Sequence, residues 1–345
     1  MKTIRLLIAA SLLLALTVSC AQKEENEPEK PVIPENKLCP LRVTAQIPGN
    51  TKAVITEEIV NGNPVFSTSW SVGDRCWITE YMDDKATSQQ FSMDLVQSEP
   101  LTQGGNPAVF QFVLSGETGV TGHSYTYRYF ASTMRNSRGY DSESNSEFYT
   151  FILPQTQIVK PGILDTNADI LVSDVQEFDS RQDDLSFNFA RIGTIVKLTV
   201  KGLQQGDIIE SGTWLTGDHF FASNGLEDRN KYFPKEGRYK VEGGDNYINF
   251  AGLSACPLVA DDNGEAVLYL RCFSGVIDDW FELSLVVKRA GHTISLSKYV
   301  DMVAASRTLQ FNDGGVTMFS VTVLPTAAPA GRDDYGSPVT DGWNY

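Results

Sequence analysis

From residue 38 onward, the dominant feature of the sequence is an alternation of apolar and polar residues with a period of two. The clearest example is the segment 41–47, where polar residues separate Leu41, Val43, Ala45 and Ile47. Successive side chains of a strand point to opposite faces, so this pattern predicts strands with one buried and one solvated face. The same alternation recurs in the segments 125–130, 147–153, 192–200, 266–272, 281–287 and 318–323. Helical patterns are scarce, and the segment 298–306 is long enough for a turn or two of helix.

Turn-forming residues separate these predicted strands. They cluster as Gly-Gly-Asn-Pro at 104–107, Gly-Gly-Asp-Asn at 243–246 and Asp-Asp-Asn-Gly at 261–264. Many short strands joined by frequent turns are typical of β-sandwiches. The sequence therefore predicts an all-β fold.

The length of 345 residues corresponds to two domains at about 150 residues each. A weak boundary lies in the acidic stretch 174–184, and no internal repeat is evident at the residue level. The predicted division is a signal peptide (1–19), a linker (20–37), an N-terminal β-sandwich domain (38–183), a C-terminal β-sandwich domain (184–325) and a tail (326–345).

Composition excludes several classes of protein. Hydrophobic residues make up 41% of the chain, which excludes wholesale disorder. The 43 acidic and 28 basic residues give a net charge of −15, and this acidity argues against a nucleic-acid partner because little could displace counterions from a phosphate backbone. The five cysteines, at positions 20, 39, 76, 256 and 272, are too few for a disulfide scaffold and wrongly spaced for zinc.

The N-terminus has the layout of an export signal. Lys2 and Arg5 precede an apolar run at 6–18, which is too short to span a membrane, and Cys20 follows directly. A cysteine at this position resembles the lipobox of bacterial lipoproteins, in which the thiol is lipidated before cleavage. The alternative is an ordinary signal peptide with an incidental Cys20.

The residues after Cys20 suggest where the protein is sent. Lys-Glu-Glu at 23–25 resembles a signal that directs some Gram-negative lipoproteins across the outer membrane to the cell surface. A solvated linker is the alternative, because the segment 24–36 also contains three Pro residues and several charges.

Motifs of catalysis, cofactor binding and metal binding are missing from the sequence. His123, His219 and His292 are isolated, and nucleophile-elbow, phosphate-loop and dinucleotide motifs do not occur. Asp261 and Asp278 each begin a short acidic cluster that could bind calcium, but a turn or an exposed loop explains each one better. We therefore expect no enzyme activity, no cofactor and no metal site.

Tryptophans are the residues most suited to stacking on sugars. In β-proteins they more often lie in the core, and this is the expectation for most of the set, namely Trp70, Trp77, Trp214, Trp280 and Trp343.

Three stretches together resemble the fimbrillin-like lipoproteins that build type V pili. The first runs from Trp70 to Ile78 and is similar to the W-x-x-G-D-x-aliphatic-x-aliphatic signature of that superfamily, with Gly73 and Asp74 at a turn and Cys76 in place of an aliphatic residue. The second combines Leu-Pro-Gln-Thr-Gln at 153–157 with Ala-Asp-Ile-Leu-Val at 168–172. The third is Ser-Phe-Asn-Phe at 186–189 leading into 195–200, with Phe189 where relatives often have His.

The resemblance covers residues 38 to 325 approximately and implies two tandem transthyretin-like β-sandwich domains with Greek-key connections. It also implies a structural or tip subunit of a fimbria on the outer-membrane surface that supports adhesion, with other pilus subunits, a trypsin-like processing protease and, through the lipid, the outer membrane as partners. In that family, the protease removes the first strand, and a strand of the next subunit fills the groove that it leaves. The resemblance implies that the protein is exported as a lipoprotein to the outer-membrane surface and later joins the fimbrium. It does not imply which ligand the protein would bind in adhesion.

The segment 41–47 is the candidate for the removed strand, and the polar loop 48–53 that follows is a suitable place for cleavage. Cleavage would follow Lys52 and make Ala53 the new N-terminus. The alternative is that Lys52 is an ordinary loop lysine and the strand stays in place. Because a Cys39–Cys76 disulfide would tether the strand, free thiols are expected.

The tail 326–345 is a weaker candidate for a donor segment, because its Pro and Gly residues suit a regular strand poorly. Val339 and Trp343 are its potential anchors, and a tail without donor function would suit a tip subunit. A different functional class also fits the sequence, namely a surface glycan-binding lipoprotein of a polysaccharide-uptake system. Exposed coplanar tryptophans would favour this alternative, and buried tryptophans would favour the pilus.

Overall fold

The computed structural model of the chain describes residues 38–325, apart from 48–55, 61–62, 68, 88, 117–118, 120–121, 135–137, 218–221, 223–229 and 242–243. Every element in this described part is a β-strand, and none of its segments is a helix able to cross a membrane. The predicted all-β fold class is confirmed.

The first large sheet runs in the order β5-β4-β7-β11-β13-β1-β6, and β12 pairs with β7 beside this path. Strands β5 and β6, at opposite ends of the order, contact each other, so the sheet curls around its own core. The bounds are β1 (Cys39–Gln46), β4 (Trp77–Asp84), β5 (Gln90–Gln97), β6 (Ala108–Leu114), β7 (Tyr125–Ser132), β11 (Leu171–Ser173), β12 (Gln176–Phe178) and β13 (Asp184–Arg191).

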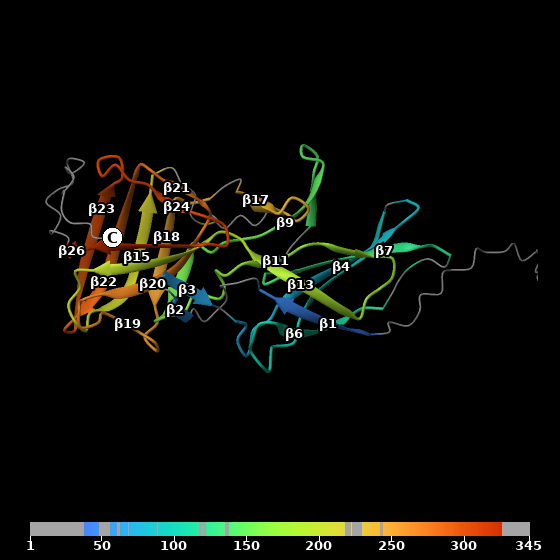
Figure 1. Cartoon of the computed structure of the whole chain (residues 1–345), viewed down its shortest axis with the longest axis horizontal. Helices are drawn as coiled ribbons and strands as arrows, with labels where there is room; N and C mark the ends of the chain where they lie inside the picture. The colour runs from blue at the N-terminus through green and yellow to red at the C-terminus, as the bar shows by residue number, and fades with distance from the viewer. Residues whose placement is uncertain are drawn as a thin grey trace, which may run out of the picture.

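A second body is built from two sheets packed face to face, with a buried apolar cluster drawn from both. One has the order β20-β14-β25, and the other has the order β10-β18-β15-β22-β23-β26, with β19 beside β15. The bounds are β10 (Thr156–Val159), β14 (Thr194–Lys201), β15 (Ile208–Thr216), β18 (Tyr247–Gly252), β19 (Leu258–Val259), β20 (Ala266–Cys272), β22 (Trp280–Arg289), β23 (His292–Asp301), β25 (Val316–Thr322) and β26 (Leu324–Pro325). Figure 1 shows the two bodies side by side along the long axis of the molecule.

Smaller sheets complete the described strands. They have the orders β17-β16-β9-β8, β2-β3 and β21-β24. Their bounds are β2 (Thr56–Val60), β3 (Asn63–Ser67), β8 (Arg138–Asp141), β9 (Ser146–Thr150), β16 (Asn230–Phe233), β17 (Arg238–Val241), β21 (Gly275–Ile277) and β24 (Leu309–Phe311).

Each of the seven segments with period-two alternation contains a strand, namely β1, β7, β9, β14, β20, β22 and β25. Two of them are longer than their strands, because β9 ends at Thr150 and β14 begins only at Thr194. The expected helical turns at 298–306 are wrong in their first half, because β23 continues to Asp301. There it pairs with β22, and Val300 lies opposite Phe281 with both side chains in the core. A single turn follows, in which the Ala305 N–H donates to the Asp301 carbonyl at 3.1 Å.

The two bodies repeat one arrangement that the sequence does not reveal. Strand β1 lies parallel to β13 and antiparallel to β6, and β14 lies parallel to β25 and antiparallel to β20. In each body, one strand therefore sits between a parallel strand from later in the chain and an antiparallel one. Only Ile192 and Gly193 separate β13 from β14, and Gly193 has φ +74, with the Cys272 carbonyl oxygen 2.3 Å from where a Cβ would be. Glycine is therefore required at this tight link.

Two segments cross the predicted boundary between residues 183 and 184. Strand β10 precedes that boundary but pairs with β18 of the second body. Strand β16 follows it but pairs with β9, and Tyr232 lies opposite Tyr149. A third buried cluster includes Phe130 and Tyr149 together with Tyr232 and Phe273, so it combines residues from both sides of the predicted boundary. The two bodies are thus interlocked by strand pairing as well as by packing.

A buried charge cluster lies at the same junction. Asp169 accepts two hydrogen bonds from Arg191, at 2.6 and 2.9 Å, and its carboxylate lies 3.9 Å from the Arg271 Nε. The Arg271 side chain is fully buried and also donates to the Ile192 carbonyl. Burial, together with the nearby positive charge of Arg191, lowers the pKa of Arg271 to about 9. One carboxylate therefore compensates two guanidinium groups drawn from both bodies.

The Gln157 side chain forms a second clamp at the junction. Its amide nitrogen donates to the Arg271 carbonyl at 2.7 Å, and its amide oxygen accepts from the Arg271 N–H at 2.8 Å. Gln157 and Asp169 belong to the second stretch that carries the family resemblance. Their place in the structure gives both residues a physical role in joining the bodies.

We predict that Asp169→Asn destabilises the protein by about 3–5 kcal/mol, because it leaves buried guanidinium groups without their countercharge. The free energy of unfolding in urea measures this effect. Asp184→Asn is the matched control, since the Asp184 carboxylate lies 3.6 Å from Arg42 and both side chains are more than half exposed. It should change stability little. Equal effects of the two substitutions would contradict this account.

Candidate functional site

Strand β1 is not an edge strand. It lies within the first sheet between β13 and β6, as Figure 1 shows. Val43, near its centre, pairs with Leu185 of β13 and with Phe110 of β6. The main chain of β1 therefore pairs on both sides, and its departure would expose two strand edges to solvent.

The four alternating side chains of the predicted removable strand all point into the core. Leu41, Val43, Ala45 and Ile47 are between 0% and 2% exposed and belong to the buried cluster of the first body. Burial of each of the three larger side chains contributes about 1.5–3 kcal/mol. The apolar face of β1 is thus an integral part of this core.

Each end of β1 is held by polar contacts that other elements supply. At its C-terminal end, the Asn106 amide nitrogen donates to the Ile47 carbonyl at 2.8 Å, and its amide oxygen accepts from the Ile47 N–H at 2.9 Å. Near its N-terminal end, the Arg42 N–H donates to the Asp183 carbonyl at 2.9 Å. These bonds add to the strand pairing that holds β1 in the sheet.

The loop before β13 is anchored by a largely buried ion pair. Arg181 donates two hydrogen bonds to the Glu80 carboxylate of β4, at 2.9 and 2.5 Å. Burial raises the pKa of Glu80, while Arg181 acts against that rise. Gln182 of the same loop donates its N–H to the Tyr129 hydroxyl at 3.0 Å. The loop that contacts the start of β1 is thus tied to the opposite side of the core.

Several of the predicted site residues lie outside the described part of the chain. These are the lipidation residue Cys20, the processing residues Lys52 and Ala53, and the tail anchors Val339 and Trp343. The four described cysteines, Cys39, Cys76, Cys256 and Cys272, form no disulfide with one another. No disulfide among these residues tethers β1 to its neighbours.

The residues of the Trp70 stretch form a turn that closes the first body. Gly73 has φ +89, and its N–H donates to the Leu101 carbonyl at 2.8 Å. The Asp74 carboxylate accepts from the Ser71 N–H at 2.8 Å, and its carbonyl accepts from the Leu101 N–H at 2.9 Å. The structure places these residues in a supporting role, at a turn that precedes β4.

The indole of Trp70 is 1% exposed and packs edge-on against Phe110 and Phe189, with ring centroids 4.8 and 5.5 Å apart. Phe110 belongs to β6 and Phe189 to β13, the two strands that flank β1. Phe189 therefore fills the core here. Trp70 connects the turn to the walls of the β1 site.

The remaining tryptophans differ in their surroundings. Trp214 is fully buried, whereas Trp77 and Trp280 are half-buried. The ring centroid of Trp214 lies 5.9 Å from that of Phe311 and 5.6 Å from that of Phe319. The acidic cluster at 261–264 forms the turn that the sequence favoured, because the Asp261 carboxylate accepts from the Asn263 N–H at 2.9 Å.

Sequence reasoning missed the walls of the β1 site. Strand β6 buries Ala108, Phe110, Phe112 and Leu114, but the outward-facing Val109 and Val113 are also apolar and hide its period of two. Asn106 lies in a predicted turn, and its side-chain contacts with Ile47 bridge 59 positions of the sequence. The signal for β6 was a short apolar run bounded by turn residues.

Comparisons with known proteins give matches by structure alone. No family profile and no curated protein matches the chain. It is similar to a candidate cell adhesion protein from Bacteroides ovatus, with 12% identity, a TM-score of 0.42, and coverage of 84% of this chain and 97% of that one. It is also similar to a candidate cell adhesion protein from Bacteroides fragilis, with 9% identity and a TM-score of 0.45. That match covers 85% of this chain and 99% of the other. A fimbrial assembly protein from Parabacteroides distasonis is similar with 10% identity and a TM-score of 0.31. That match covers 83% of this chain and 90% of the other.

The turn yields a direct test. Gly73→Ala should destabilise the protein by about 1–2 kcal/mol, because an L-residue is strained at this positive φ. Open space surrounds the position, so no clash contributes. Gly275→Ala is the matched control, since its Cβ would also meet open space and its φ is not in the left-handed region. Urea unfolding of both variants measures the difference, and equal stabilities would show that the turn carries no strain penalty.

Proposed function

We propose that this chain is an exported subunit of a cell-surface fimbria that supports adhesion, and that it joins the fimbria by exchange of strand β1. The observation that carries the proposal is the position of β1, a strand that lies between two other strands without a disulfide to either. It has three fully buried side chains, and the buried Ile47 follows it directly. A segment of this kind can be replaced by another extended segment with the same alternation.

In this proposal, Cys20 carries the lipid that first anchors the protein to the outer membrane. A trypsin-like protease then cleaves after Lys52, which makes Ala53 the new N-terminus. The fragment that contains β1 is afterwards held by strand pairing and packing alone. Other fimbrial subunits are the partners that provide the replacement strand.

The repeat between the two bodies supports β1 as the exchanging strand. Strand β14 occupies the equivalent place in the second body, but its N-terminal end is joined to β13 by two residues and the buried junction lies around that link. Strand β1 is followed by a longer connection, residues 47–55, before β2 begins. A cut in that connection would separate β1 from the rest of the protein, whereas β14 would remain attached.

The walls of the site define what the replacement strand must look like. Removing β1 would expose the apolar side chains of Phe110 and Phe187 and the unpaired edges of β6 and β13. Ala45 pairs with Ala108 and with Phe187 and is fully buried, so the present strand has a small side chain at this place. A fitting strand therefore has bulky aliphatic side chains at alternate positions and a small one in place of Ala45.

The alternative function, a glycan-binding lipoprotein of an uptake system, leads to an expectation of exposed coplanar tryptophans. Trp70 and Trp214 are instead fully buried, and Trp77 and Trp280 are half-buried. This distribution supports the fimbrial role over an uptake protein built around a tryptophan platform.

The processing step is tested by limited trypsin digestion of the full chain followed by N-terminal sequencing. We expect a stable product that begins at Ala53, and we expect Lys52→Ala to prevent its formation. Lys235→Ala is the control, because Lys235 is exposed in the turn between β16 and β17 and its loss should leave this product unchanged. A stable product that retains residues 41–47 in the same polypeptide would contradict the proposal.

Strand exchange is tested with synthetic peptides of residues 40–47 added to the cleaved protein after its own fragment has been displaced. We expect the native peptide to bind and the Val43→Asp peptide to bind at least about 100-fold more weakly, because it buries an unpaired charge. The Thr44→Asp peptide carries the same charge at a position that points away from the core, so it should bind nearly as well as the native peptide. Equal binding of the two charged peptides, measured by fluorescence anisotropy, would rule out the β1 groove as the binding site.

A further inference from the structure

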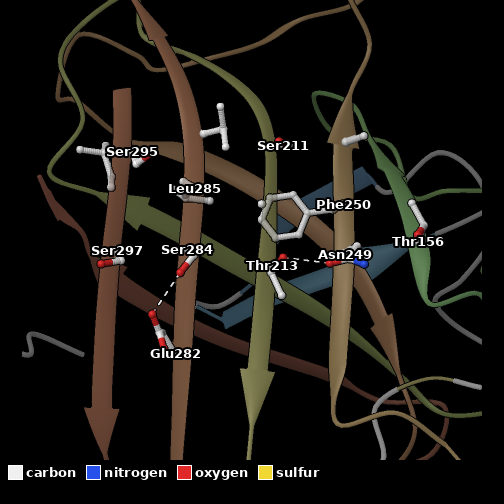
Figure 2. A pocket seen from close by; sticks show the side chains of 14 residues that line it. Thr156, Ser211, Thr213, Asn249, Phe250, Glu282, Ser284, Leu285, Ser295 and Ser297 are labelled. Carbon is white, nitrogen blue, oxygen red and sulfur yellow. Dashed lines mark hydrogen bonds between the residues drawn. The ribbon is translucent and has the colours of Figure 1, made fainter. Parts of the chain in front are cut away.

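The outer face of the second body carries a trough of about 540 Å³ that strand exchange does not use. It lies on the sheet made by β10, β18, β15, β22 and β23, and Figure 2 shows its lining from the solvent side. Phe250 and Leu285 are 1% and 2% exposed and belong to the core beneath it. The trough is therefore a surface feature over a well-packed sheet.

The floor of the trough is a single row of small polar side chains, one from each strand. Strand register places them side by side, because each residue is paired with the next across the sheet. In order, the row is Thr156, Asn249, Thr213, Ser284 and Ser297. Neighbouring strands lie about 4.8 Å apart, so this row extends about 19 Å perpendicular to the strands.

Larger side chains border this row on one side. On one side, register pairs Leu215 with Tyr247 and with Glu282, and Glu282 with Tyr299. Trp280 stacks on Tyr299 at this border, with ring centroids 5.6 Å apart and an interplanar angle of 26°. The row on the other side combines Val286 with the smaller Ala251, Ser211 and Ser295, which also line the trough.

The polar groups of the floor are partly oriented already. The Thr213 hydroxyl donates to the Asn249 amide oxygen at 2.9 Å, which leaves the amide NH₂ group as a donor. The Ser284 hydroxyl donates to the Glu282 carboxylate at 3.2 Å, and its oxygen can still accept. The floor thus offers hydroxyl, amide and carboxylate groups in a fixed order.

We propose that this trough binds a linear neutral oligosaccharide. Sugar rings present hydroxyl groups that match the donors and acceptors of the floor, and apolar ring faces that match aromatic side chains such as Tyr299. Glu282 is the only charged residue of the lining among the described residues, so an anionic ligand would meet no cation there. An added peptide strand would pair at a sheet edge, whereas this trough crosses the face of the sheet.

This binding site goes beyond the fimbrial role and does not depend on strand exchange, because β1 belongs to the other body. It would give the protein a ligand for adhesion. The two proposals can fail separately, since sugar binding is measured on the uncleaved chain.

The test is native affinity electrophoresis of the full chain in gels that contain one of four neutral polysaccharides, namely arabinoxylan, mixed-linkage β-glucan, galactomannan or glycogen. Polygalacturonate serves as the anionic comparison. We expect at least one neutral polysaccharide to retard the protein. Retardation by none of the four, or by polygalacturonate alone, would overturn the proposal.

Variants then locate the binding. Ser284→Trp, which fills the centre of the trough, should weaken binding at least tenfold, and so should the double variant Thr213→Val and Asn249→Leu, which removes polar groups at nearly constant volume. Ser186→Trp is the control, because Ser186 is exposed on β13 of the first sheet. Circular dichroism and thermal melting confirm that each variant is folded. Undiminished binding by folded Ser284→Trp and by the folded double variant would overturn the assignment to this trough.

Discussion

The burial of the apolar face of β1 between β6 and β13 is the interaction on which the first body depends. The three inward side chains of β1 and the adjacent Ile47 share one buried cluster with Phe110 and Phe187, and the Trp70 indole packs against Phe110 in the same cluster. Because the sheet curls until β5 contacts β6, the core is closed only while β1 is in place. Main-chain pairing on both sides and apolar packing therefore act together at one short segment.

From β1, a continuous set of contacts leads to the second body. Strand β13 pairs with β1 and ends at Arg191, whose guanidinium binds Asp169 at the junction. Arg271 of β20 lies against the same carboxylate, and the amide of Gln157 clamps the Arg271 main chain. Pairing of β9 with β16 crosses the junction a second time. The bodies are thus coupled through buried polar groups, which are costly to separate from their partners.

The two proposed sites occupy different bodies and use different physics. At β1, the site is an internal strand position that recognises alternation of apolar side chains and offers two main-chain edges. On the second body, the trough is a solvent-facing row of hydroxyl and amide groups bordered by rings such as Tyr299. One site suits attachment to another subunit, and the other suits contact with a sugar, so neither needs the other to operate.

Local periodicity in the sequence by itself determined the all-β class, the seven alternating strands and the inward positions of Leu41 to Ile47, because a period of two is a property of neighbouring residues. Other features were decided only by the tertiary structure. The pairing of β1 with β13, the clamp of Asn106 on Ile47 and the row from Thr156 to Ser297 join residues that are far apart in the chain. The strand at 298–301 belongs to the same group, since its pairing with β22 overrides a weak local preference for helix. Sheet register creates such neighbours, and a single sequence carries no local signal of register between distant strands.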